Sequence, residues 1–189
     1  TCAVACVSAL LLRNVGDLSA QQRWSVAGGP VVAFSQAPPS FGVHARAGYR
    51  VTPPGHRLSA QLEVFGTSMM PDARVRWTGV NGDALTVARR SELQAGATVV
   101  GILELSRSRV APYLVAGGGV YWSRVSVVNA LSGPTQPPYR FSGSFGRWGL
   151  DVAAGVGVAI RTGARRILLE VRPHSGEANY LALSAGLTL

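Results

Sequence analysis

The last ten residues of the chain, 180–189, follow a two-residue repeat that runs to the final position. Leu181, Leu183, Ala185, Leu187 and Leu189 are apolar, and the residues that alternate with them from position 182 onward are small or polar. Successive side chains of a β-strand point to opposite faces, so the repeat predicts a strand with one apolar and one small, polar face. Such a strand fits a sheet that separates two different solvents.

The same alternation recurs in seven earlier segments, and most of them are close to the ~9–11 residues that a tilted transmembrane strand needs. No apolar run reaches the roughly 18 residues of a membrane-spanning helix. A closed barrel is the other structure that satisfies its backbone in lipid. The sequence therefore predicts an all-β fold, an eight-stranded antiparallel up-and-down transmembrane β-barrel. The seven earlier segments are residues 24–34, 41–51, 57–67, 93–105, 110–123, 148–161 and 166–172.

The links between the segments are sorted by length. Short turns follow the second, fourth and sixth segments, whereas the longest links, residues 69–92 and 124–147, follow the third and fifth. Outer-membrane barrels combine short periplasmic turns with longer loops on the outside. The sorting therefore favours a membrane barrel over a soluble one.

Six aromatic residues on the apolar faces lie near segment ends, where aromatic rings favour the boundary between membrane and water. We expect them to form two girdles, although aromatic side chains in a half-apolar sheet must lie somewhere in any case. They are Phe34, Phe41, Trp122 and Trp148 at the end with the long links, and Trp24 and Tyr49 at the end with the short turns.

The opposite, polar faces carry ionisable side chains of both signs. The interior of an eight-stranded barrel is just wide enough for side chains to fill it. Buried charges there must be paired, so we expect an interior network of arginine–carboxylate pairs, with Arg161 solvated at a strand end. Its expected members are Arg46, Arg50, Glu63, Glu104, Asp151, Glu170 and Arg172.

The first residues differ from the rest. Residues 3–12 are apolar, and Leu18-Ser19-Ala20 resembles a cleavage site with small residues, so residues 1–20 are predicted to be a signal-peptide remnant and residues 21–189 the barrel domain. A short N-terminal helix is the alternative. Both cysteines, Cys2 and Cys6, fall in this first part.

Several functions are disfavoured by the residues. The formal charge is +9 and every basic residue is arginine, but the arginines are scattered and no nucleic-acid motif appears. His174, Ser175 and Glu177 could form a nucleophilic set, yet adjacent His and Ser side chains of a strand point to opposite faces. No Cys/His cluster suggests a metal, so we expect no cofactor and no enzymatic activity.

The glycine-rich stretches at residues 112–119 and 148–161, together with the terminal alternation, resemble the small bacterial outer-membrane β-barrel family, the OmpA/OmpX-like proteins, over residues 23–189. The resemblance implies location in the outer membrane of a Gram-negative-type bacterium and a last strand that the barrel-assembly machinery reads. Family members end mostly in Phe, whereas this chain ends in Leu189. An outer-membrane lipid A deacylase is also similar in architecture, but its His-x-Ser motif does not match His174-Ser175.

These observations together predict a monomeric outer-membrane barrel with a structural or surface-interaction role and no wide pore. The alternatives are a lipid A-modifying hydrolase and a soluble lipocalin-like barrel, which would need an apolar interior. Expected partners are outer-membrane lipid and lipopolysaccharide, whose phosphates suit arginine. The arginines on or beside the long links are Arg74, Arg76, Arg89, Arg90, Arg124, Arg140 and Arg147.

Overall fold

The computed structural model describes residues 23–34, 39–53, 56–70, 75–78, 84–132, 139–163, 165–175 and 179–189. Residues 1–20, predicted to be a signal-peptide remnant, lie outside this part. None of the described residues belongs to a helix long and apolar enough to cross a membrane. The strands are β1 (Trp24–Ala33), β2 (Ser40–Arg50), β3 (Leu58–Met70), β4 (Val75–Thr78), β5 (Ala84–Glu104), β6 (Val110–Ser132), β7 (Tyr139–Thr162), β8 (Arg165–Ser175) and β9 (Tyr180–Thr188).

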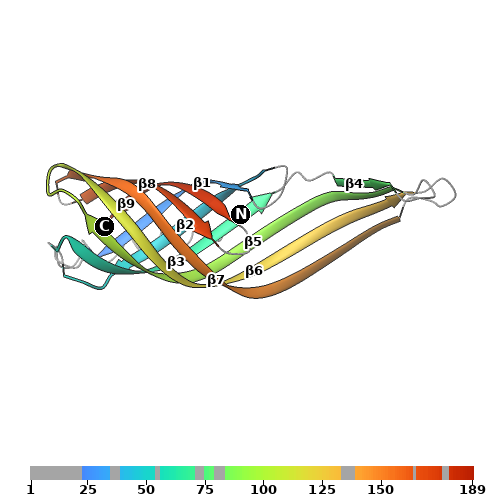
Figure 1. Cartoon of the computed structure of the whole chain (residues 1–189), viewed down its shortest axis with the longest axis horizontal. Coiled ribbons are helices and arrows are strands. Elements are labelled where there is room, and N and C mark those ends of the chain that lie inside the picture. Colours follow the sequence, from blue (N-terminus) through green and yellow to red (C-terminus); the bar gives the residue numbers. More distant parts are fainter. Residues whose placement is uncertain are drawn as a thin grey trace.

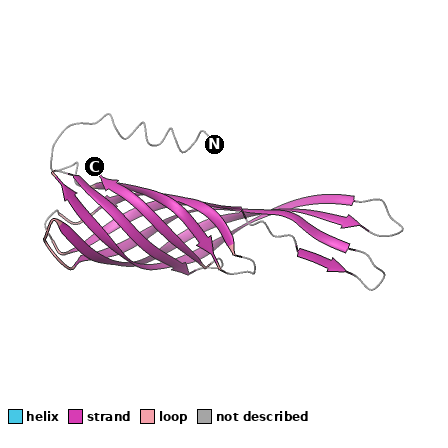
Figure 2. Cartoon of the chain, turned by 90° about the horizontal axis from the view of Figure 1, so that it is seen from above, coloured by secondary structure: helices cyan, strands magenta, loops and turns pink. Residues whose placement is uncertain are grey.

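Eight of these strands close into a barrel (Figures 1 and 2). Each pairs antiparallel with its neighbours in the order β1, β2, β3, β5, β6, β7, β8, β9, and β9 pairs back onto β1. The short strand β4 pairs only with β5 and lies outside the ring. The predicted fold class, an eight-stranded antiparallel up-and-down barrel, is confirmed.

The two faces of the wall differ as the alternation predicts. Leu150 is 74% exposed on the outside, while its neighbour Asp151 is 3% exposed on the inside. Val64 (60%) and Glu63 (3%) show the same contrast on β3. A water-soluble barrel would bury its valines and leucines and expose its carboxylates. Here the apolar face points outward and the polar face points inward.

Three strands continue well past the barrel. β5, β6 and β7 have 21, 23 and 24 residues, about twice what a membrane crossing requires. Their outer halves, with β4, form a sheet that projects from one end (Figure 1). β8 pairs with β7 only between Val152 and Thr162, so the first half of β7 forms an edge of this projecting sheet.

This projection corrects one expectation. The long links predicted at residues 69–92 and 124–147 are largely strand, and β6 and β7 stay in register from Val110↔Ile160 to Leu131↔Tyr139. Apolar–polar alternation continues in part of this region, as at Tyr139, Phe141 and Phe145. A membrane strand of ~9–11 residues is expected to end at the barrel, so these residues were assigned to links.

Glycines on the inner face let strands and side chains approach closely. A Cβ on Gly119 would collide with the carbonyl oxygen of Ala97 on the neighbouring strand, and a Cβ on Gly157 would meet the ring of Tyr113. A Cβ on Gly143, in the projecting sheet, would have no atom within 4 Å. Side-chain volume is thus restricted at Gly119 and Gly157 inside the barrel and unrestricted at Gly143 in the projection.

We predict that Gly119→Ala lowers the free energy of unfolding by about 1–3 kcal/mol, the usual cost of forcing extra volume into a packed site. Gly143→Ala should change it by less than about 0.5 kcal/mol. The measurement is the temperature at which the folded, fast-migrating gel band is lost in detergent. Equal loss in both variants would show that the backbone is not close-packed at Gly119.

Candidate functional site: the barrel interior

The centre of the barrel interior holds a balanced group of two arginines and two glutamates from three strands. Arg172 on β8 contacts Glu170 through Nε (2.7 Å) and Glu63 through one terminal nitrogen (2.5 Å). Arg46 on β2 contacts Glu170 at 2.7 Å and Glu63 at 3.7 Å. All four side chains are at most 7% exposed. We call these four residues the central network.

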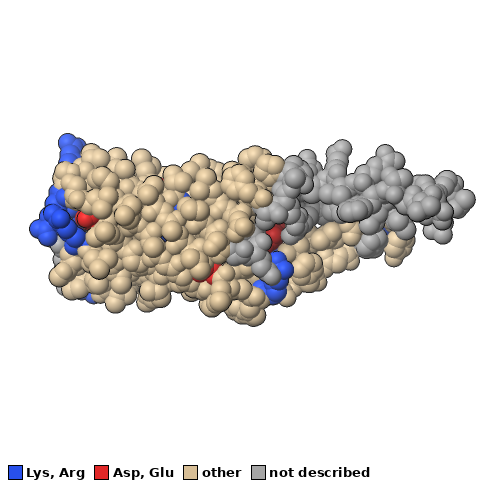
Figure 3. Space-filling view, viewed as in Figure 1, with Lys and Arg blue, Asp and Glu red and all other residues tan. Residues whose placement is uncertain are grey.

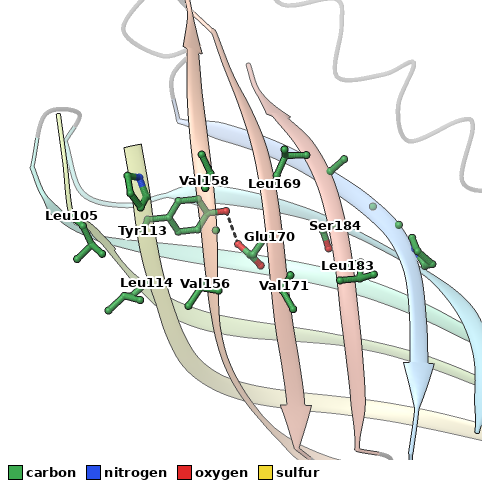
Figure 4. Close-up of a pocket in the computed structure, with 16 residues that line it drawn as sticks. Leu105, Tyr113, Leu114, Val156, Val158, Leu169, Glu170, Val171, Leu183 and Ser184 are labelled. Atoms are coloured by element: carbon green, nitrogen blue, oxygen red, sulfur yellow. Dashed lines mark hydrogen bonds between the residues drawn. The ribbon is translucent and has the colours of Figure 1, made fainter. Parts of the chain in front are cut away.

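The strand register explains how a tyrosine joins this network. Tyr113 on β6 pairs with Gly157 on β7, and Gly157 pairs with Glu170 on β8. Because Gly157 has no side chain, the Tyr113 ring lies across β7 (Figure 4), and its hydroxyl donates to Glu170 Oε2 at 2.8 Å. Gln61 donates to Glu63 Oε1 at 3.0 Å. Both carboxylates of the central network therefore accept bonds from neutral donors as well as from arginines.

A second group lies at the end with the short turns. Glu104 faces three arginines: Arg50 at 3.8 Å, Arg161 at 3.4 Å, and Arg166 in close contact. Arg161 was expected to be solvated, but its side chain is 34% exposed and also donates to the carbonyl of Arg107 at 2.9 Å. Arg166 was not among the expected network residues, although it shares the inward face of β8 with Glu170 and Arg172.

A third group lies nearer the projection and contains Asp151. Asp151 was expected to pair with arginine, yet its partner is His174 Nδ1 at 3.0 Å. The Tyr180 ring stacks on His174, with centroids 4.5 Å apart and planes 9° from parallel. His44 and the Thr67 hydroxyl are 3.2 Å apart. The expected charged residues thus fall into three groups along the barrel, and not one network.

The alternative catalytic set is not assembled. His174 is buried on the inner face, whereas Ser175 is exposed on the outer face, where its hydroxyl lies 3.5 Å from the carbonyl of Val152. The two side chains are on opposite sides of the wall, as strand geometry requires. Glu177 lies outside the described residues.

The expected girdle residues lie on the outer face at the two ends of the wall. Trp24 and Tyr49 are cross-strand neighbours with ring centroids 5.0 Å apart at the short-turn end. Trp122 and Trp148 are cross-strand neighbours at the other end, where Trp148 is 75% exposed. Phe34 (62%) and Phe41 (64%) are exposed at that same end of β1 and β2.

The interior is filled where the charged groups meet. A cavity of 30 Å³ lies between the central network and the group around Glu104, which is room for no more than a few water molecules. No group of three or more His, Cys, Asp or Glu side chains in the described residues is placed to hold a metal ion. The arrangement is therefore suited to holding the wall together and to blocking passage.

No protein-family model matches the chain, and no curated protein matches it. Three solved structures to which it is similar are small bacterial outer-membrane barrels, in agreement with the resemblance expected from the sequence. Ail, the attachment invasion locus protein of Yersinia pestis, solved with the heparin analogue sucrose octasulfate, is 10% identical over 87% of this chain and 95% of its own, with a TM-score of 0.46.

Neisserial surface protein A (NspA) is 21% identical over 87% of this chain and 93% of its own, with a TM-score of 0.46. The N-terminal β-barrel domain of Pseudomonas aeruginosa OprF is 12% identical over 88% of this chain and 96% of its own, with a TM-score of 0.38. The fold of this chain rests on the pairing of its own strands.

We predict that Glu170→Leu lowers the free energy of unfolding by about 3–5 kcal/mol, because it leaves buried arginines without their carboxylate. Replacing the whole central network, with Arg46→Met, Glu63→Leu and Arg172→Met added, should recover much of that loss, since no charge then remains unpaired. Heat-dependent gel mobility measures both. A single variant as heat-resistant as the wild type would contradict the network.

Proposed function

We propose that this chain is an outer-membrane β-barrel protein with a structural or surface-interaction role and no wide pore. The observation that carries the proposal is the inside-out wall: an exposed apolar belt surrounds an interior of paired charges. Hydrocarbon is the solvent in which such a belt is stable, and a closed barrel leaves no sheet edge unpaired in it.

The position of the aromatic residues supports this placement. Trp24 and Tyr49 at one end, and Phe34, Phe41 and Trp148 at the other, bracket an outer wall of leucine, valine and alanine. Aromatic side chains at both ends of an apolar belt fit the two membrane–water boundaries. The wall between the two girdles is the part that would cross the bilayer.

The filled interior supports a role other than transport of large solutes. Eight strands enclose a space that side chains fill, whereas porins with an aqueous channel have about 16–18 strands. The central network occupies that space here, and the cavity beside it has room for no more than a few waters. The barrel then acts as an anchor for what projects from it.

The projecting sheet supports the surface-interaction role. If the short turns face the periplasm, as in outer-membrane barrels, the outer halves of β5, β6 and β7 extend away from the cell. Tyr139 (63%) and Phe145 (54%) are exposed there. An exposed sheet with aromatic side chains and an open edge strand offers backbone and side-chain contacts to another molecule.

Lipopolysaccharide is the lipid partner that the arginines at this end suit. Arg124 and Arg140 are exposed near the base and in the outer half of the projection, where phosphate groups of an outer leaflet would be in reach. Of the other expected residues, the structure describes Arg147 as partly exposed. The side chains of Arg74, Arg76, Arg89 and Arg90 lie outside the described part.

Assembly is proposed to depend on the last strand. β9 closes the barrel by pairing with both β8 and β1, and its outward row Leu181, Leu183, Ala185 and Leu187 suits recognition by the barrel-assembly machinery. With all strands of the ring paired, the barrel is complete as a monomer.

The membrane assignment predicts that Val152→Arg, on the outward belt, destabilises the folded barrel by about 2–4 kcal/mol in a bilayer. Ser142→Arg adds the same side chain to an exposed position of the projection and should change stability by less than about 0.5 kcal/mol. Urea unfolding in lipid vesicles measures the difference. A wild-type chain that stays in the aqueous phase on detergent partitioning would overturn the proposal.

The lipopolysaccharide assignment predicts that Arg124→Gln/Arg140→Gln weakens retention of purified lipopolysaccharide by the detergent-solubilised protein by roughly tenfold, because two arginine–phosphate contacts are lost. Retention is measured by co-elution at fixed salt concentration. Unchanged retention in the double variant would reject these two residues as the contact.

A further inference from the structure

The outer wall is hollowed at more than one place. A hollow of 430 Å³ lies beside Phe34, Val152 and Leu181, and a larger one lies elsewhere on the wall. The larger hollow is a groove with a volume of 890 Å³ that crosses the wall from the end of β5 to the middle of β1, within the range of pockets that hold drug-sized ligands (~300–1,000 Å³). Its lining follows the strand register, since Pro112 pairs with Val158 and Val158 with Leu169. The outward positions further round are occupied by Gly28, Pro30 and Ala185 among others, and such small or compact residues leave the wall hollow.

The side chains that line the groove are those of the lipid-facing row. Leu105, Leu114, Val156 and Val171 surround it (Figure 4), and all are exposed on the outer face. The polar residues in the lining, Glu170 among them, point to the interior, where their partners lie. The groove therefore offers a predominantly apolar surface, which suits a hydrocarbon chain.

Arginines gather just beyond the groove, at the end with the short turns (Figure 3, left). Glu104 is the only acidic side chain among the described residues at this end, and three arginines already face it. The strand ends and turns there carry five more arginines, which leaves a large excess of positive charge. These five are Arg23, Arg57, Arg107, Arg109 and Arg165.

The arginines and the groove lie along the same strands. Arg165 begins β8 in the same outward row as Leu169, four residues from it, which is about 13 Å along a strand. The backbone carbonyl of Arg109 accepts from Arg161 N at 2.8 Å, so Arg109 lies beside the end of β7, next to β8. Both side chains are exposed. The groove thus ends in a positively charged rim where the apolar belt ends.

We propose that the groove and this rim bind a glycerophospholipid with an anionic headgroup, with an acyl chain in the groove and the phosphate beside Arg109 and Arg165. The inference rests on the proposed function, since both need the wall to face hydrocarbon. Phosphate accepts bidentate bonds from guanidinium groups. The excess of arginine favours a headgroup with net negative charge over one that also carries an ammonium group.

A second copy of the chain is the less suitable occupant. Two walls that met groove to groove would bring the same arginine rims together, and like charges at an interface oppose association. A lipid supplies the opposite charge and the hydrocarbon in one molecule.

The test is native mass spectrometry of the full chain released from micelles that contain equal amounts of phosphatidylglycerol and phosphatidylcholine with identical acyl chains. We expect one phosphatidylglycerol to be retained in preference to phosphatidylcholine. Arg109→Gln/Arg165→Gln should reduce that preference by roughly tenfold, and higher salt should reduce it too.

A groove-filling variant separates a shaped site from charge alone. Ala185 lines the groove on the outer face and is exposed, so Ala185→Phe should fold and insert while retaining less lipid. Equal retention of the two lipids by the wild type would overturn the inference, and so would a preference that survives Arg109→Gln/Arg165→Gln. Full retention by Ala185→Phe, or a persistent dimer in place of the lipid adduct, would overturn it as well.

Failure of this inference is distinguishable from failure of the proposed function. The heat-dependent gel shift and partitioning into detergent are recorded on the same samples. If the protein shows the gel shift and enters detergent but has no headgroup preference, the phospholipid site alone is rejected. If it shows no gel shift and does not enter detergent, the membrane barrel is rejected.

Discussion

The structure depends on the pairing of β9 with β1. These strands are the last and the first of the ring, and Ser25↔Thr188 through Ala33↔Tyr180 join them. An open sheet would leave a row of N–H and C=O groups unpaired at each edge, which costs several kcal/mol per group in hydrocarbon. Closure removes both edges, and only then can the wall turn its leucines and valines outward. The inward position of the charged groups of the central network follows from it.

Closure of the barrel also removes the interior side chains from most of the surrounding water. Side chains fill an eight-stranded barrel, so arginine and glutamate on the inner faces have little water to solvate them. The central network balances two of each, and Tyr113 and Gln61 supply further hydrogen bonds to the carboxylates. Such an ion cluster holds strands β2, β3 and β8 in one arrangement because removing any charged member leaves a buried charge, and the Tyr113 hydrogen bond joins β6 to it.

The sequence predicted the parts of this structure that depend on a period of two. A strand that faces two different surroundings must alternate apolar and polar residues, and this alternation alone placed Glu63 and Glu170 inside and Leu150 outside. It does not tell which inward residues lie at the same height in the barrel, because that depends on the register between neighbouring strands. Asp151 illustrates the limit: its partner His174 follows from the pairing Ala153↔His174, which no local pattern encodes. The projecting halves of β5 to β7 were missed because strands were expected to end at membrane length, although alternation continues at Tyr139, Phe141 and Phe145.

The geometry of the interior ion pairs explains why arginine suits the basic positions of this chain. Arg172 contacts Glu170 through Nε and Glu63 through a terminal nitrogen, so one planar cation bridges two carboxylates from different strands. A lysine ammonium is a compact point charge with a flexible stem and no such fork. At the end with the short turns arginine lies in different surroundings. Arg161 and Arg166 both contact Glu104, while Arg109 and Arg165 are exposed. One side-chain chemistry thus rigidifies the closed interior and leaves a cationic rim where the wall meets water.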